Sequence, residues 1–236
     1  VMKILITGAK GFVGKNLVAS LKNIRDGKDR VHPIKGLEHP EDLTIYEYDI
    51  DSTPEELDAY CQDADFVFSL AGVNRPKNQE DFMKGNFGFA STLLDTLKKY
   101  GNKAPVMLSS SIQASLTGRF AGSEYGKSKL AGEELFQKYG EETGAKVLIY
   151  RFPNLFGKWC RPNYNSAVAT FSNNIANDLP ITVNDRSTEL ELVYIDDLIE
   201  EFILAVNGEE HRDENGFCFC PVSFHVTLGE IVDLLY

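Results

Sequence analysis

The chain is poor in the residues that build disulfide frameworks and metal sites. Its 236 residues include four cysteines and four histidines. The cysteines form no C-x-x-C pair and no cluster with histidine at the spacing of zinc ligands, so we expect reduced thiols and no resident metal. No run approaches the roughly 18 apolar residues that a membrane-spanning helix needs, and no membrane partner is expected.

Other absences narrow the chemistry and the partners. The formal net charge of -11 disfavours a nucleic-acid partner, because a surface that binds DNA or RNA is usually basic. The sequence has no G-x-S-x-G motif and no histidine beside a nucleophile motif, which leaves hydrolytic mechanisms without support. No signal peptide precedes the first predicted strand, and together with reduced thiols this predicts a cytoplasmic protein.

What the sequence does have is a regular alternation of strand and helix patterns. Strands are expected at 3–7, 43–48, 66–70, 106–108 and 146–150, and helices at 12–24, 54–61, 80–100 and 124–139. This order predicts an α/β fold with a doubly wound parallel sheet of the Rossmann type, and a further strand at 30–34 is left open. The rhythm breaks after Arg151. We therefore predict a dinucleotide-binding domain over 1–152 and a small, loop-rich substrate lobe over 153–236, interleaved with the sheet edge.

A glycine-rich turn, Thr7-Gly-Ala-Lys-Gly-Phe-Val-Gly14, joins the first strand to the first helix. Gly8 can adopt a φ that a side chain forbids, Gly11 lets backbone N–H groups approach a pyrophosphate, and Gly14 lets the helix lie close to the sheet. The helix N-terminus adds partial positive charge. We predict a dinucleotide site here, formed by Gly8, Lys10, Gly11, Phe12, Val13 and Gly14. A glycine turn that binds nothing is the simpler alternative.

A second group of polar residues surrounds the end of the strand at 106–108. Three serines, Ser109 to Ser111, occupy its carboxyl end, where open α/β sheets place their ligands. Tyr125 and Lys129 follow four residues apart, so that a helix presents both on one face. A nearby ammonium favours the phenolate, and we expect it to lower the pKa of Tyr125. With a serine hydroxyl beside them, these groups can move a proton to or from an alcohol or ketone.

Together these segments resemble the extended short-chain dehydrogenase/reductases. The resemblance rests on the glycine turn, Leu70-Ala-Gly72, Asn86, the three serines, Tyr125-x-x-x-Lys129, Arg151-Phe-Pro-Asn154 and Val193-Tyr-Ile-Asp-Asp197. It implies Ser111, Tyr125 and Lys129 as catalytic residues, with Tyr125 the proton donor in reduction and Lys129 also on the nicotinamide ribose. It further implies Leu70, Ala71, Gly72 and Pro153 at the cofactor, and Ser111 and Asn154 at a nucleotide-sugar.

Longer segments, at 71–76, 108–114, 153–166 and 226–236, are similar to one branch of that family. The branch contains the reductase domains of bifunctional capsular-polysaccharide enzymes of UDP-N-acetyl-L-fucosamine synthesis. It implies NADPH-dependent reduction of a UDP-4-keto-6-deoxyhexosamine to UDP-2-acetamido-2,6-dideoxy-L-talose, followed in the chain by a cupin domain. A homodimer is also expected from the resemblance. Because Leu190 replaces an arginine that many relatives use for pyrophosphate, Arg161 or Arg186 is expected to substitute, and Asn163 is expected at the sugar.

Two residues point to different cofactors. Asp49, after the strand at 43–48, suits an unphosphorylated adenosine ribose. It lies about 35 residues after Gly14, however, whereas the acid of the fingerprint is expected after about 20, so it could touch the adenine instead. Lys10 suits a 2′-phosphate, and the branch resemblance adds weight to it. We predict NADP(H), with NAD(H) as the alternative.

Three other functions are alternatives to this reduction. A UDP-sugar 4-epimerase would hold NAD tightly and return the hydride to the sugar. A 4,6-dehydratase needs a further acid and base, which such relatives carry as Asp-Glu directly after the serine, and Ile112-Gln113 at that place disfavours it. A non-catalytic NADP-sensing module is a remote alternative, since both Tyr125 and Lys129 are present. The role of the 112–124 loop is left open.

Overall fold

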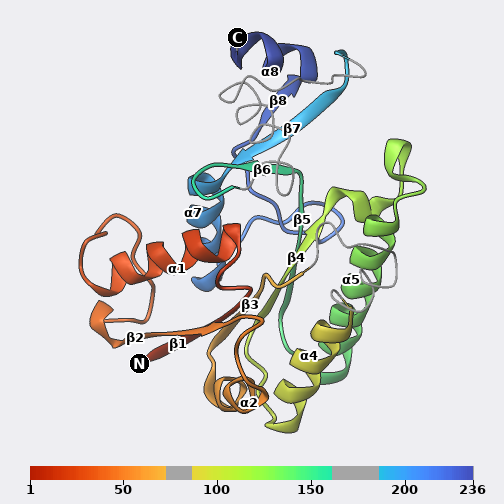
Figure 1. Ribbon diagram of the computed structural model, residues 1–236. Coiled ribbons are helices and arrows are strands. Elements are labelled where there is room, and N and C mark those ends of the chain that lie inside the picture. Colours follow the sequence, from red (N-terminus) through yellow and green to blue (C-terminus); the bar gives the residue numbers. More distant parts are fainter. Residues whose placement is uncertain (73–86, 161–185, 236) are drawn as a thin grey trace.

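The central element is a parallel sheet of five strands with the order β2-β1-β3-β4-β5 (Figure 1). The computed structural model describes residues 1–72, 87–160 and 186–235. The strands are β1 (Met2–Thr7), β2 (Leu43–Tyr48), β3 (Phe66–Ser69), β4 (Val106–Ser111) and β5 (Val147–Phe152). This confirms the predicted α/β fold with a doubly wound sheet. No strand forms at 30–34, and β2 pairs directly with β1.

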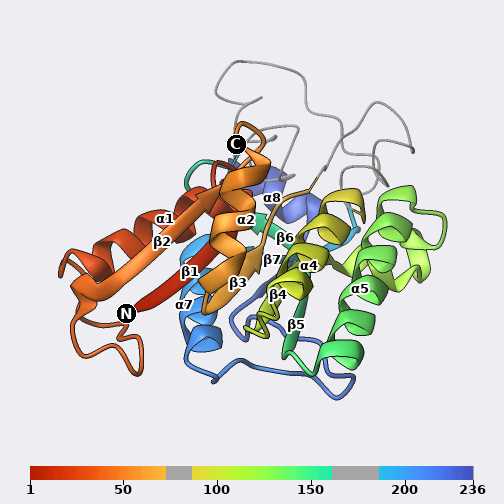
Figure 2. The same cartoon turned by 90° about the horizontal axis from the view of Figure 1, so that it is seen from below.

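Helices cover both faces of the sheet (Figures 1 and 2). They are α1 (Phe12–Arg25) and α7 (Ile195–Val206) on one face, and α2 (Pro54–Asp63), α4 (Phe89–Lys99) and α5 (Glu124–Thr143) on the other. Ile4 and Ile6 belong to the core shared with α1 and α7, whereas Leu5 belongs to the core shared with α2, α4 and α5. A strand buried on both faces is a continuous apolar run, and for this reason β1 was recognisable in the sequence.

The chain after β5 forms a second, smaller sheet. Strand β6 (Asn154–Phe156) pairs in parallel with β7 (Glu189–Tyr194), and β7 pairs antiparallel with β8 (Phe224–Thr227). Helix α8 (Leu228–Leu235) follows β8, and Leu190, Leu192 and Ile231 form a local core. The expectation of a loop-rich lobe after Arg151 was therefore incomplete, because these strands are short and lack the long apolar runs of the main sheet. The division into domains at residue 152 stays a prediction.

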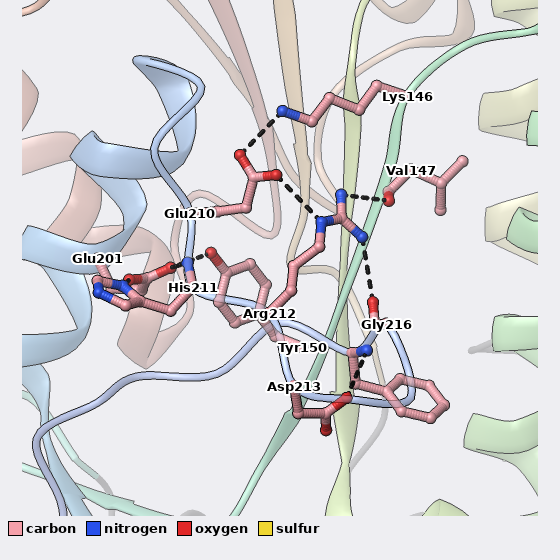
Figure 3. Close-up of polar contacts among 10 residues, drawn as sticks. Lys146, Val147, Tyr150, Glu201, Glu210, His211, Arg212, Asp213 and Gly216 are labelled. Carbon is pink, nitrogen blue, oxygen red and sulfur yellow. Dashed lines mark hydrogen bonds and ion pairs between the residues drawn. The ribbon is translucent and has the colours of Figure 1, made fainter.

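The segment after α7 returns to the edge of the main sheet (Figure 3). Cys218 forms a parallel bridge with Tyr150 of β5. Glu201 of α7 is 1% exposed; it accepts a hydrogen bond of 2.5 Å from the Tyr150 hydroxyl, and Nδ1 of His211 lies 2.5 Å from its other oxygen. A carboxylate can be buried when it is hydrogen-bonded in this way. These contacts attach α7 and the 207–220 segment to β5.

Candidate active site

The glycine turn has the tight geometry that its sequence predicts. Gly8 has a φ of +73°, and a Cβ there would lie 2.7 Å from the backbone nitrogen of Ala71. A Cβ on Gly14 would lie 2.1 Å from the carbonyl oxygen of Gly8. Both positions therefore require glycine, and the close approach places the start of α1 directly against the ends of β1 and β3.

The N-terminus of α1 lies at this turn. Gly11 is the N-cap, and within the described residues no side chain caps the helix and no acid lies in its first turn. The first N–H groups of a helix have no partner within the helix and carry partial positive charge. The turn and the helix start, from Gly8 through Phe12 and Val13 to Gly14, therefore fit the pyrophosphate of a dinucleotide.

Lys10, which favours NADP(H), and Asp49, which favours NAD(H), lie next to each other at the glycine turn. Asp49 accepts a hydrogen bond of 2.8 Å from the backbone N–H of Lys10. The ammonium of Lys10 pairs with Asp51, and the two side chains are 66% and 60% exposed. Asp49 thus braces the glycine turn, while the charge of Lys10 stays at the surface beside the end of β2.

The predicted catalytic residues converge at the carboxyl end of β4. Ser111 is the last residue of β4 and its hydroxyl oxygen accepts a hydrogen bond of 3.1 Å from the N–H of Gln113. Tyr125 and Lys129 lie on the first two turns of α5, with Nζ of Lys129 5.5 Å from the centre of the Tyr125 ring. The same Nζ donates to the carbonyl oxygen of Ser109 at 3.1 Å.

Burial governs the protonation of this pair. It raises the pKa of Tyr125 to about 12 and lowers the pKa of Lys129 to about 8. The expectation that the lysine lowers the pKa of the phenol was wrong. Both groups lose solvation, and the ammonium is bonded to the Ser109 carbonyl. Tyr125 is therefore a protonated phenol near neutral pH, which suits a proton donor, and Lys129 titrates close to neutrality.

The 112–124 loop, whose role the sequence left open, positions the start of α5. A Cβ on Gly126 would lie 2.3 Å from the carbonyl oxygen of Gln113, so the helix packs directly on the loop backbone. Ser123 caps the helix by accepting from the N–H of Gly126 at 2.8 Å and donates its own hydroxyl to the Gln113 side chain at 2.7 Å. The sequence does not predict a role at the site for these three residues. A serine is a recognisable N-cap, but no local pattern indicates its hydrogen bond to Gln113.

A buried asparagine joins the glycine helix to the loop after β6. Asn16 of α1 donates from Nδ2 to the carbonyl oxygens of Phe12, at 3.0 Å, and of Lys158, at 2.8 Å. It is 7% exposed. The sequence contains no signal for this role, because the partner residue, Lys158, is 142 residues away along the chain. The contact holds the loop after β6 beside α1.

The other predicted residues are distributed around this centre. Leu70, Ala71 and Gly72 follow β3, and the N–H of Leu70 donates to the carbonyl oxygen of Thr7 at 3.1 Å. Pro153 lies between β5 and β6, and Asn154 is the first residue of β6. Arg161, Asn163 and Asn86 lie outside the described residues. Arg186 is bonded to Asp233 of α8 at 2.7 Å.

The described residues hold neither a metal-binding cluster nor a membrane-spanning helix. No group of three or more histidine, cysteine, aspartate or glutamate side chains could hold a metal ion there. In the same part of the chain, no helix combines the length and apolar character that crossing a membrane requires.

Known proteins resemble this chain along most of its length. The model of the NAD dependent epimerase/dehydratase family matches residues 4–216. The chain is 39% identical over its whole length to the UDP-2-acetamido-2,6-beta-L-arabino-hexul-4-ose reductase of Pseudomonas aeruginosa, of which it covers 57%. The capsular polysaccharide assembling protein CapF from Staphylococcus aureus superposes with a TM-score of 0.79 at 47% identity, over 100% of this chain and 58% of that chain.

A more distant structure shares the fold. The UDP-glucuronic acid 4-epimerase from Bacillus cereus, solved with UDP-glucuronic acid and NAD, superposes with a TM-score of 0.75 at 22% identity, over 99% of this chain and 82% of that chain. The chain spans less than two thirds of the length of the Pseudomonas reductase and of the Staphylococcus protein. In agreement with the resemblance to extended short-chain dehydrogenase/reductases, the chain belongs to the NAD dependent epimerase/dehydratase family.

Proposed function

We propose that this chain reduces the 4-keto group of a UDP-4-keto-6-deoxyhexosamine with NADPH, giving UDP-2-acetamido-2,6-dideoxy-L-talose for capsular or surface polysaccharide synthesis. The observation that carries the proposal is the position of Tyr125 on the first turn of α5, with Nζ of Lys129 5.5 Å from its ring centre and bonded to the Ser109 carbonyl of β4. The relative named as a hexul-4-ose reductase, 39% identical over the whole chain, supports the substrate class.

Ser111, Tyr125 and Lys129 have different roles in the proposed reduction. NADPH, when bound, supplies the hydride that reaches the ketone carbon. The hydroxyl oxygen of Ser111 already accepts the N–H of Gln113, so its own proton is available to the ketone oxygen. Tyr125 transfers its phenolic proton to that oxygen as the alcohol forms. Lys129, held on the Ser109 carbonyl, favours the phenolate that remains and donates to the nicotinamide ribose.

Cofactor and substrate occupy opposite sides of this centre in the proposal. The glycine turn and the start of α1 bind the pyrophosphate, Lys10 binds the 2′-phosphate, and NADP(H) is preferred to NAD(H). Leu70 to Gly72 and Pro153 border the nicotinamide half. The residues assigned to the nucleotide-sugar are Ser111, Asn154, Arg161 and Asn163. The predictions of a cytoplasmic location and a homodimer belong to the same proposal.

The mechanism is tested by Tyr125→Phe. Loss of the proton donor should lower turnover about 10²- to 10⁴-fold, the usual contribution of general acid catalysis. The dissociation constant of NADPH should stay near the wild-type value, because the phenyl ring still fills the site. NADPH oxidation with the keto sugar gives the first quantity and a fluorescence titration gives the second. Wild-type turnover in Tyr125→Phe would refute the mechanism.

A further inference from the structure

The three consecutive serines at the end of β4 make three different contacts. The carbonyl of Ser109 holds Lys129, and the hydroxyl of Ser111 is assigned to the substrate. Ser110 continues the row of alternate side chains that faces α5. Its hydroxyl donates to Oε2 of Glu133 at 2.5 Å, and neither residue belongs to the site described above.

Glu133 lies on α5 one turn after Lys129 and two turns after Tyr125, on the same helix face. Its side chain is 1% exposed. Arg151, which is the register partner of Ser110 on the neighbouring strand β5, donates to both carboxylate oxygens, from Nε at 2.9 Å and from Nη2 at 2.7 Å. The guanidinium of Arg151 also stacks 3.9 Å from the ring centre of Phe217. The carboxylate is therefore fully bonded to two adjacent strands.

A contribution to stability does not by itself account for a buried ion pair of this kind. Burying two charges costs several kcal/mol per ion, and apolar residues of similar volume often replace such a pair without loss. The position of Lys129, one turn earlier on α5, gives a better reason for a carboxylate at this place. Its two strand contacts fix the rotation of α5, and one turn earlier the same helix presents Lys129 to the Ser109 carbonyl.

The charge of Glu133 also acts on Lys129. The side of Lys129 toward β3 and α4 is lined by Ser69, Ala71 and Ala90, which carry no charge. Tyr125 of α5 is a neutral phenol, and the charge of Arg151 on β5 is matched by Glu133 itself. Glu133 is therefore the acid that faces Lys129 within the described residues, and it raises the pKa of Lys129 against the larger lowering by burial.

We propose that Glu133 is a positioning residue for the reductive step: bound to Ser110 and Arg151, it fixes the turn of α5 that carries Lys129 and keeps that ammonium charged beside Tyr125. The role rests on the proposed function, because it acts through Lys129. It differs from the roles of the catalytic trio in that Glu133 contacts neither substrate nor cofactor.

The test compares Glu133→Gln with Glu134→Gln. Glu134 is the next residue, is exposed, and loses the same charge. Without the carboxylate the pKa of Lys129 falls below its value of about 8, so the high-pH limb of turnover should move to lower pH. Turnover of Glu133→Gln should fall at every pH because the turn that carries Lys129 is held less firmly, and it should fall severalfold further near pH 8 than near pH 6. Glu134→Gln should match the wild type throughout.

A second variant keeps the test decisive if Glu133→Gln fails to fold, since Arg151 would then be a buried, unpaired charge. The double variant Glu133→Gln/Arg151→Met removes both charges and should fold, yet keep the displaced high-pH limb. A pH profile that superimposes on the wild type, or a loss that is equal at every pH, would overturn the positioning role. A wild-type chain that fails to oxidise NADPH with the keto sugar would instead refute the proposed function.

Discussion

At the scale of single residues, the corner beside the glycine turn is crowded with charge. The pKa of Lys10 is raised, first by its hydrogen bond to Asp51 and further by the charges of Asp49 and Glu47. An exposed ion pair of this type contributes little to stability. It does matter for a ligand, because a 2′-phosphate would compete with Asp51 for the ammonium and would be repelled by the other carboxylates.

We therefore expect Asp51→Asn to strengthen NADPH binding severalfold, because the substitution releases Lys10 and removes one negative charge. NADH, which lacks the 2′-phosphate, should bind as before and serves as the internal control. Lys10→Ala should weaken NADPH binding alone. Fluorescence titrations of both cofactors measure this. Equal changes for NADPH and NADH in either variant would contradict the assignment of Lys10 to the 2′-phosphate.

The same scale shows where prediction from the sequence stopped. The spacing of Tyr125 and Lys129 correctly placed both on one helix face, because helix geometry is local. The direction of the Tyr125 pKa was wrong, since desolvation depends on everything packed around the phenol. The sequence gives no signal for Glu133 although it stands at the next helical repeat, because its partner Arg151 comes from a neighbouring strand.

At the scale of elements, α5 organises the site. It begins on the Ser123 cap, rests through Gly126 on the Gln113 carbonyl, and carries Tyr125 and Lys129 toward β4. A shift of its first turn would displace the phenol of Tyr125 relative to the end of β4 even with every proposed catalytic side chain intact. Misplacement by about 1 Å can cost on the order of 10²-fold in rate.

Gly126→Ala tests this dependence. The added Cβ would lie 2.3 Å from the Gln113 carbonyl oxygen and must push the helix and the loop apart. We expect turnover to fall at least tenfold, with NADPH binding nearly unchanged because the glycine turn lies elsewhere. Gly132→Ala on the same helix is the matched control, since its Cβ would meet only the Leu108 side chain at 3.9 Å. Equal turnover in the two variants would show that the loop does not position Tyr125.

Elements were predictable to the extent that their signals are local. The strand at 43–48 was found at its predicted bounds, because β-branched and aromatic residues alternate along it. The small sheet was not predicted, since β6 has three residues and β8 has four. The bridge between Cys218 and Tyr150 joins segments far apart in the sequence, and no local sequence pattern predicts such a contact.

At the scale of the whole molecule, Glu201 connects α7, the edge strand β5 and the segment after α7. It lies on α7, which packs with α1 over the main sheet, and it binds both Tyr150 of β5 and His211 of the returning segment (Figure 3). Arg212 of the same segment adds bonds to Glu210 and to the carbonyl oxygen of Val147. The segment between α7 and β8, whose strand belongs to the small sheet, is thus attached to β5 of the main sheet.

Tyr150→Phe should destabilise this arrangement by about 1–3 kcal/mol, because a buried carboxylate loses a charge-assisted hydrogen bond. Urea unfolding measures the change as a lower midpoint with an unchanged slope. Turnover under folding conditions should not change, since Tyr150 lies outside the site. Tyr100→Phe is a comparison at a half-buried tyrosine that binds Asp58, and its effect should be smaller. Unaltered stability in Tyr150→Phe would contradict the role assigned to Glu201.

The central claim is that the molecule is a reductase that consumes its cofactor. Its most direct test is the stoichiometry of NADPH oxidation against loss of the UDP-4-keto sugar by the purified wild-type chain. A reductase oxidises one NADPH for each ketone converted to an alcohol, and this is the result that we predict. Conversion of a UDP-sugar with no net oxidation of NADPH would indicate a 4-epimerase with tightly held NAD and would contradict the account.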